Sequence, residues 1–588
     1  MYTRKGGMER MTFKWAYGWM GKYKWRLVLS IVLNILGVVA MTAEPFIFSA
    51  IVDDVLMPQQ FDKLLPMLCS AIGVGCIFIA CRYFQAILGE QAAQAAVYNV
   101  RSALFKNLMK QSGNFYATNR SGDLINKCSS DVEMMNHFIC WVTPKWVEMV
   151  LMLVAALIVF FRINWQYTLI LFAVTPFSAI VGAKLAKSVR PAFADAREQL
   201  SRLNTVVQEN ISGNRVVKAF VREDYEIEKF QKENQEYKRL NIQANMIWLK
   251  YGPIIDSIAS VMTVMNLIVG GVMVVLEQIT LGDLTLFLSL AWALNEPMIL
   301  VGQLVNDTQR FLASAEKVMG LYYTKTDIEQ PIKDSTPATA KGEIEFKDVS
   351  LSYGSLKVLD HVDLHINPGE TIGIMGPTGS GKTSLVSLIP RFIDVSSGEV
   401  MLDGVNVKNY NLQKLRSRVG MTMQDVFLFS DTVESNIVYG VPDLPMEKVV
   451  EAAKVADADG FISQMPDGYD TIVGERGTGL SGGQKQRISL ARAIAKDAPV
   501  LILDDTTSAV DMETETAIQK ALGELETRAT TLIIAQRVSS VMHADRIIIL
   551  DDGKIVEQGS HNELMALKGY YYNTCILQHG VMEEEVSA

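Results

Sequence analysis

The stretch Gly376-Pro377-Thr378-Gly379-Ser380-Gly381-Lys382-Thr383 decides the fold of the second half of the chain. It fits the P-loop pattern G-x-x-x-x-G-K-[ST]. Apolar, β-prone residues precede it at 371–375, and a helical pattern begins at Ser384. Glycines let backbone N–H groups close around phosphate oxygens, and the start of a helix adds partial positive charge. We therefore predict a nucleotide site in which Lys382 reaches the β- and γ-phosphates and the Thr383 hydroxyl ligates Mg²⁺, with Ser384 next to them.

Length and composition point to a membrane protein of more than one domain. The chain has 588 residues, too many for one ordinary core. Hydrophobic residues make up 49% of it and gather in the first half, which is typical of a membrane domain. The net charge of -9 argues against nucleic acid as a partner. The six cysteines show no C-x-x-C spacing, so they predict neither a metal site nor a secreted disulfide framework.

The first half contains apolar stretches long enough to cross a hydrocarbon core of about 30 Å as helices. We predict six crossings, at 26–51, 64–88, 138–161, 163–185, 252–276 and 281–305. Two long polar connections, 89–137 and 186–251, are rich in helix formers. Tracts of about 30 residues would extend about 45 Å at 1.5 Å per residue, well beyond the bilayer. The predicted fold class is therefore a membrane α-helical bundle of six transmembrane helices with long cytoplasmic extensions.

Basic residues set the expected orientation. Lysine and arginine gather before the first crossing and in the long connections, whereas the short connections carry Asp53, Asp54, Glu277 and Asp283. Cytoplasmic segments are the ones enriched in lysine and arginine. We therefore expect a multi-pass protein of the plasma membrane with both termini cytoplasmic. Residues 1–25 are basic and aromatic, and they predict an elbow helix lying on the membrane surface.

Three carboxylates, Glu148, Asp256 and Glu296, fall inside predicted crossings. A charge at membrane depth is costly and usually faces a cavity or a partner. Glu148 and Glu296 are candidates for a polar point in a substrate path. The alternative is that each is satisfied by a hydrogen bond between helices, and the sequence leaves both interpretations open.

The domain boundary is expected at a polar segment, 324–340, that contains Pro331 and Pro337. Strand and helix patterns then alternate to the end of the chain, which predicts an α/β P-loop ATPase domain. The expected organisation is an elbow helix at 1–25, a transmembrane domain at 26–323, a linker at 324–340 and a nucleotide-binding domain at 341–588.

Two further motifs follow the P-loop. Leu480-Ser481-Gly482-Gly483-Gln484 opens a helix and predicts a second site of phosphate size. The segment 500–505 is an apolar strand that ends in two carboxylates. Asp504 should hold the Mg²⁺ shell, and the next position should orient or deprotonate the attacking water.

In this combination the chain resembles the ATP-binding cassette (ABC) exporters, in the half-transporter arrangement of one membrane domain fused to one ATPase domain. The resemblance covers nearly the whole chain and implies ATP and Mg²⁺ as ligands. It implies that Tyr353 stacks on adenine and that Gln424 links Mg²⁺ to the membrane domain. It also implies that 474–477 touches the cytoplasmic turns and that 508–511 crosses to a second subunit.

Two positions depart from the family pattern. The residue after Asp504 is normally glutamate, but here it is Asp505. The switch position is normally histidine, but here it is Gln536. Aspartate is one methylene shorter, and a misplacement on the order of 1 Å can cost ~10²-fold in rate. Glutamine can donate a hydrogen bond but cannot become cationic. Together these predict a site that holds ATP and hydrolyses it poorly.

The intact signature at 480–484 then suggests a heterodimer, because in this family ATP lies between the P-loop of one subunit and the signature of the other. We expect a second half-transporter as partner, membrane lipid around the chain and an amphiphilic small molecule, drug or lipid, as substrate. A homodimeric flippase with Asp505 as a slow base remains an alternative. A membrane regulator that binds ATP without transport is another.

Overall fold

A computed structural model describes residues 2–173, 175–506, 510–524 and 529–579. The chain forms two compact units. Unit 1 comprises Met1–Met109 and Arg120–Thr324, and unit 2 comprises Lys110–Asn119 and Lys325–Ala588. The chain therefore passes from one unit to the other at three junctions, 109/110, 119/120 and 324/325.

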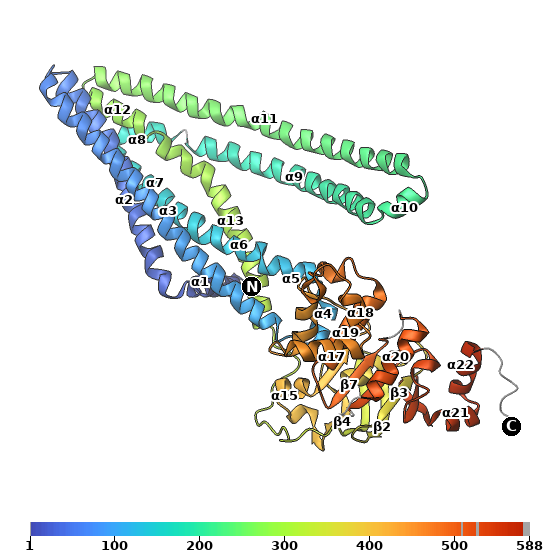
Figure 1. Cartoon of the computed structure of the whole chain (residues 1–588). Coiled ribbons are helices and arrows are strands. Elements are labelled where there is room, and N and C mark those ends of the chain that lie inside the picture. The colour runs from blue at the N-terminus through green and yellow to red at the C-terminus, as the bar shows by residue number, and fades with distance from the viewer. Residues whose placement is uncertain (1, 174, 507–509, 525–528, 580–588) are drawn as a thin grey trace. The chain divides into compact units, whose positions relative to one another are not determined.

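Unit 1 is helical throughout its described residues (Figure 1). Its α-helices are α1 (Tyr2–Gly18), α2 (Lys24–Ile51), α3 (Leu64–Leu108), α5 (Ser121–Cys128), α6 (Ser130–His137), α7 (Thr143–Ile163), α8 (Trp165–Phe172), α9 (Thr175–Ser212), α10 (Asn214–Ala219), α11 (Glu223–Val275), α12 (Leu281–Leu290) and α13 (Trp292–Tyr323). Two π-helical turns, Val52–Leu56 and Phe138–Val142, adjoin α2 and α7.

The predicted crossings all fall on these helices. Within the described part of the chain, three helical stretches are long and apolar enough by themselves to cross a membrane, namely Gly21–Leu56, Phe61–Leu108 and Ser121–Ile163. The crossing predicted at 163–185 falls on α8 and the start of α9, with residue 174 outside the described residues. Those at 252–276 and 281–305 fall on the end of α11 and on α12 with α13. The helical membrane fold expected from the sequence is confirmed.

The long polar connections are helices, as predicted, and a short helix forms part of the reversal in each of them. α9 and α11 lie side by side as a long pair (Figure 1). After α9 ends at Ser212, the reversal contains a short helix, α10, and the chain resumes as α11 at Glu223. Likewise a short helix, α4 (Gly113–Thr118), forms part of the first reversal. Neither short helix contains a proline, and the Ser112 side chain caps α4 by accepting from the Phe115 N–H at 3.4 Å.

Aromatic side chains fix the N-terminal helix to unit 1. The ring of Phe13 lies 5.8 Å from that of Phe311, which stacks on Phe138 at 4.0 Å. Trp19 meets Tyr322 edge-on at 5.3 Å. α1 and the segment after it are therefore packed against α13 and the Phe138–Val142 turn.

Unit 2 is built on two β-sheets. The first is antiparallel, with strand order β2-β1-β4-β5, and consists of β1 (Ile344–Tyr353), β2 (Leu356–Ile366), β4 (Ser397–Leu402) and β5 (Val405–Asn406). The second has strand order β10-β9-β3-β8-β7-β6, and consists of β3 (Thr371–Met375), β6 (Val419–Thr422), β7 (Val500–Asp504), β8 (Thr530–Ile534), β9 (Arg546–Asp551) and β10 (Lys554–Gly559). One buried apolar cluster draws on both sheets and on α14 (Lys382–Ser387).

The remaining helices of unit 2 complete its α/β fold. They are α15 (Leu412–Ser417), α16 (Val433–Ile437), α17 (Met446–Val455), α18 (Asp459–Ile462), α19 (Gly482–Ile494), α20 (Met512–Gly523), α21 (His561–Leu567) and α22 (Tyr570–His579). A second apolar cluster is formed largely by α16 to α19.

The order of the second sheet positions the candidate site. Strands β3, β8, β7 and β6 are neighbours and run parallel. Their carboxyl ends therefore meet at one edge, which is where ligands bind in open α/β sheets. The segments that leave this edge are the P-loop after β3, Gln536 after β8, Asp505 after β7 and Gln424 after β6.

Candidate functional site

The P-loop has the backbone that its glycines permit. Gly376 and Gly381 have φ of 143° and 99°, a region that residues with a Cβ rarely adopt. A Cβ on Gly376 would lie 2.0 Å from the carbonyl oxygen of Leu550, and one on Gly381 would lie 2.8 Å from that of Val358. These two positions therefore require glycine for both conformation and space. α14 starts directly after the loop, at Lys382.

A cavity of about 210 Å³ opens beside this loop. Most of the residues predicted for the nucleotide site contribute to its wall. It is lined by Val358, Thr378, Gly379, Gly381, Lys382, Thr383, Ser384, Gln424, Asp504, Asp505, Ile534, Ala535 and Gln536.

Lys382 is the cation of the cavity. Its Nζ donates to the backbone carbonyl oxygens of Gly376 at 2.9 Å and Pro377 at 2.8 Å. Burial lowers the pKa of Lys382, and the negative charges of Asp504 and Asp505 partly oppose that shift. Phosphate oxygens would offer this ammonium stronger acceptors than the loop carbonyls do.

The residues predicted to hold Mg²⁺ also meet here. Asp504 is 2% exposed and ends β7, while Thr383 and Gln424 line the same cavity. Burial raises the pKa of Asp504, the charge of Asp505 raises it further, and a hydrogen bond from Thr383 opposes the shift. A hydroxyl, a carboxylate and an amide oxygen are hard oxygen donors of the kind that suits Mg²⁺. The donor set therefore fits Mg²⁺ with ATP, with Thr383 and Asp504 as the direct candidates.

The two atypical residues face the same cavity. Asp505 has φ of 50°, a left-handed conformation that aspartate adopts more readily than most residues, and its N–H donates to the Ile534 carbonyl oxygen at 3.0 Å. Gln536 is exposed at the end of β8. Gln578 of α22 fixes the backbone around it, donating to the Gln536 carbonyl oxygen at 2.7 Å and accepting from the Val538 N–H at 2.8 Å.

Several predicted residues lie outside the cavity wall. Gly376 and Pro377 shape the loop and accept from Lys382. Ser380 is 4% exposed, and its Oγ has no hydrogen-bond partner within the described part of the chain. Tyr353 is 42% exposed at the end of β1 and does not line the cavity. Residues 508–511 were expected to reach across to a second subunit. Of these, Ser508 and Ala509 lie outside the described residues.

The signature Leu480 to Gln484 does not contribute to this cavity either. Ser481 is the N-cap of α19, and its Oγ accepts from the Gln484 N–H at 3.3 Å. In return the Gln484 side chain accepts from the Ser481 N–H at 2.9 Å. This reciprocal cap leaves the N–H groups of Gly482 and Gly483 at a helix start, the place where anions bind.

Sequence reasoning missed three residues of the wall and one support. Val358, Ile534 and Ala535 are apolar, and none of them was predicted to line the site. Ile534 and Ala535 could have been found as the end of a parallel strand next to β3 and β7. Gln578 lies 42 residues from Gln536, and no sequence signal connects them.

The membrane candidates Glu148 and Glu296 belong to one charged cluster in unit 1. Glu148 is 8% exposed, and its two oxygens pair with Arg82 Nη1 and Lys145 Nζ, each at 2.9 Å. Lys145 also lies 3.6 Å from Glu296. The cluster thus links α3, α7 and α13 in alternating sign. The side chain of Asp256 lies outside the described part of the structure.

Comparison with known proteins finds a matching family for each half of the chain. Residues 27–298 match the ABC transporter transmembrane region, and residues 359–508 match the ABC transporter ATPase family. The chain is 38% identical to the ABC transporter ATP-binding protein YknU of Bacillus subtilis, over 95% of both chains. It is 36% identical to the ATP-dependent lipid A-core flippase of Desulfotalea psychrophila, over 93% of this chain and 96% of that one.

Two further matches extend the comparison. The putative multidrug export ATP-binding/permease protein YgaD of Bacillus subtilis is 32% identical, over 95% of this chain and 97% of its own. The structure of a bacterial Atm1-family ABC exporter with ATP bound superposes with a TM-score of 0.79, at 23% identity, over 95% of this chain and 99% of that one. That likeness supports the fold alone. With full-length relatives above 30% identity, the chain belongs to the ABC transporters in which a transmembrane region and an ATPase domain are fused in one polypeptide.

Proposed function

We propose that this chain is the ATP-retaining half of a heterodimeric ABC exporter. The observation that carries the proposal is that Asp505 and Gln536 line one cavity with Lys382 and Asp504. Both atypical residues would therefore act on the same nucleotide. A carboxylate one methylene shorter and an amide that stays neutral would leave ATP bound but slowly hydrolysed.

The intact signature gives this chain its second role. Ser481 and Gln484 cap α19 reciprocally and present a helix start to an anion. In the proposed pair this signature would complete the partner's nucleotide site, which would carry the usual glutamate and histidine. The partner's signature would complete the cavity described here. Both termini and unit 2 would lie in the cytoplasm.

We propose an amphiphilic drug or lipid as the substrate, moved out of the cytoplasm or the inner leaflet. Relatives named as a lipid A-core flippase and as a putative multidrug exporter support this class. The charged cluster of Arg82, Lys145, Glu148 and Glu296 supports it as well, because such groups among membrane helices commonly mark a substrate pathway. Arg82 and Glu296, with side chains 40% and 36% exposed, would present the accessible charges.

One experiment tests which of the two subunits supplies the catalytic residues for ATP hydrolysis. The transporter is purified with its co-purifying partner, and Asp505 and the corresponding residue of the partner are replaced in turn. We expect Asp505→Ala to leave most ATP turnover intact and the matching change in the partner to abolish it. The reverse pattern would assign hydrolysis to this chain and overturn the proposal.

A homodimeric lipid or drug flippase is the second candidate. One observation favours it: aspartate suits the left-handed backbone at position 505, so its choice can reflect conformation rather than lost catalysis. In that case the chain expressed alone would assemble into a stable dimer with ATPase activity stimulated by substrate.

A further inference from the structure

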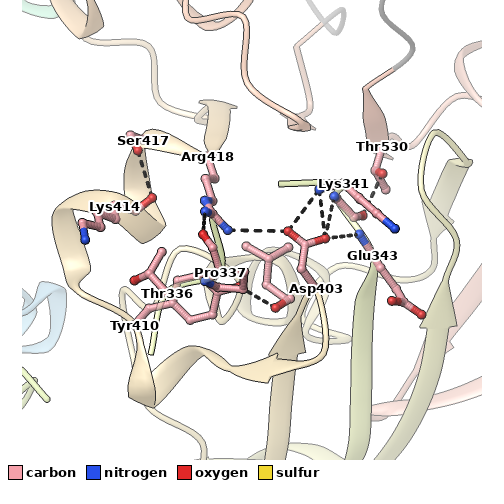
Figure 2. A network of polar contacts seen from close by, with 12 residues as sticks. Thr336, Pro337, Lys341, Glu343, Asp403, Tyr410, Lys414, Ser417, Arg418 and Thr530 are labelled. Atoms are coloured by element: carbon pink, nitrogen blue, oxygen red, sulfur yellow. Dashed lines mark hydrogen bonds and ion pairs between the residues drawn. The ribbon is translucent and has the colours of Figure 1, made fainter. Parts of the chain in front are cut away.

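The first segment of unit 2 after the 324/325 junction, residues 325–343, is held to the rest of that unit by polar anchors. Asp403 follows β4, and its carboxylate accepts three backbone N–H groups, those of Lys341 at 3.1 Å, Gly342 at 2.8 Å and Glu343 at 3.1 Å. The side chain of Asp403 is 7% exposed and that of Arg418 is 12% exposed. A carboxylate this buried, with three N–H donors and an arginine beside it, is a strong fixed point (Figure 2).

Arg418 holds an earlier residue of the same segment, Pro337. Its guanidinium lies between the Asp403 carboxylate, 3.6 Å away, and the Pro337 carbonyl oxygen, to which it donates (Figure 2). Thr530 adds a contact at the other end by donating to the Gly342 carbonyl oxygen at 2.8 Å. The backbone from Pro337 to Glu343 is therefore bound to three separate strands or strand ends of the ATPase fold.

A second anchor lies closer to the N-terminal end of the segment, at residues 330–336. Asp334 accepts from Lys414 Nζ at 2.7 Å and from the Thr336 N–H at 2.9 Å. The Ser335 N–H donates to the Asn409 carbonyl oxygen at 3.0 Å. Gln330 accepts from the Leu412 N–H at 3.3 Å. Despite its prolines and polar composition, the segment is a strap lying on β4, η5 (Val407–Asn409) and α15 rather than a free tether.

The two places where the chain passes between the units at 109/110 and 324/325 are also tied to each other. Within unit 1, Asn107 Nδ2 donates to the carbonyl oxygens of Leu321 at 2.8 Å and Thr324 at 3.2 Å, so the ends of α3 and α13 are joined. Within unit 2, Ser112 Oγ donates to Asp327 Oδ2 at 3.1 Å, so the two chain segments are joined again at the third residue after each junction. Little unanchored chain remains between Thr324 and Asp327.

We propose that residues 325–343 are a stiff strap belonging to the ATPase unit, clamped by Asp403 and Arg418, that delivers ATP-driven movement of that unit to α13 at the 324/325 junction. A slack linker would let the ATPase unit move without α13, whereas a clamped one forces the two to respond together. The proposal rests on the proposed ATP-driven transport.

Hydrogen exchange on the full transporter in lipid nanodiscs, with and without ATP and Mg²⁺, tests this directly. In Arg418→Ala we expect the amides of 334–343 to exchange at least about tenfold faster, since a charge-assisted anchor is lost. We expect the ATP-induced change in exchange at the ATPase cavity to persist and that in α13 to fall at least several-fold. Arg418→Lys should restore part of the α13 response.

Arg546→Ala is the matched control, because Arg546 pairs with Glu370 at 2.9 Å and donates to a backbone carbonyl away from the strap. It should leave the α13 response intact. If Arg418→Ala fails to fold, Asp334→Ala, which removes the outer anchor on an exposed surface, replaces it.

The possible results distinguish a failure of the proposed ATP-driven transport from a failure of the proposed strap. A wild-type protein with no ATP-induced change in either unit would contradict the proposed transport. A normal α13 response in a variant whose strap exchanges fast would overturn the strap. Unchanged strap exchange in the variants would overturn the clamp assigned to these residues.

Discussion

At the scale of single residues, the cavity combines an ordinary phosphate site with two unusual groups. Lys382, Thr383 and Asp504 are the residues that a P-loop ATPase uses, and Asp505 and Gln536 face them from adjacent strand ends. Under the proposed function, binding and hydrolysis would depend on different residues, so each could be changed alone.

Restoring the usual groups should restore hydrolysis. Asp505→Glu lengthens the carboxylate by one methylene, and Gln536→His supplies a group that can carry charge. We expect the double variant to hydrolyse ATP at this site up to ~10²-fold faster, with the affinity for ATP little changed. Single-turnover hydrolysis with the partner's catalytic carboxylate neutralised measures this. An unchanged rate in the double variant would mean that these two residues do not limit hydrolysis.

The raised pKa of Asp504 predicts a pH dependence of Mg²⁺ binding. Because the folded-state pKa lies above the ordinary 3.8, the buried carboxyl holds its proton to a higher pH than a free aspartate does. Mg²⁺ needs the ionised form, so as pH falls the affinity for Mg²⁺ with ATP should decline at a higher pH than an exposed aspartate would give. Calorimetric titration across pH checks this, with Asp504→Asn as the control that should abolish the dependence. A decline unchanged in Asp504→Asn would contradict it.

Much of this residue set could be predicted from the sequence, for a physical reason. Glycine spacing and strand ends are local features, and parallel pairing brings the ends of β3, β8, β7 and β6 to one edge. Gln578 and Val358 could not be predicted, because their places depend on contacts between distant parts of the chain. Tyr353 and the signature were predicted for the nucleotide, yet they do not line the cavity in a single chain.

At the scale of elements, charged and polar pairs hold the membrane helices to one another. The cluster around Lys145 and Glu148 joins α3, α7 and α13. The sequence singled out Glu148 and Glu296 but not their cations, because it shows no register between helices. Both hypotheses made from the sequence, a substrate path and an interhelical bond, remain compatible with a cluster that is paired at its centre and exposed at its ends.

Removing the central cation should destabilise the membrane unit. Lys145→Met leaves Glu148 with Arg82 alone and removes the cation nearest Glu296. We expect the free energy of unfolding to fall by roughly 1–3 kcal/mol, which is less than the 3–5 kcal/mol lost when a fully buried ion pair is broken. The double variant Lys145→Met with Glu148→Gln should recover part of it, since an uncompensated carboxylate is then gone. Thermal unfolding of the purified protein measures both. Equal midpoints for the wild type and the single variant would show that the cluster adds no stability.

At the scale of the whole molecule, one chain carries a helical membrane unit and an ATPase unit. The fold class was predictable because hydropathy and P-loop motifs are strong local signals. That residues 110–119 group with the ATPase unit was not, since only contacts between distant segments reveal it. The segment 324–340 shows the same limit, because its composition predicts a boundary but not the anchors at Asp403 and Arg418.

The functional claim at this scale is that the chain retains ATP and needs a second subunit to complete a rapid cycle. The most direct measurement is the steady-state ATPase rate of this chain purified alone in a lipid bilayer, together with its bound nucleotide. We predict tightly bound ATP and turnover at least ~10²-fold below that of the chain assembled with its partner. Brisk hydrolysis by the chain alone would contradict the claim and establish a homodimer.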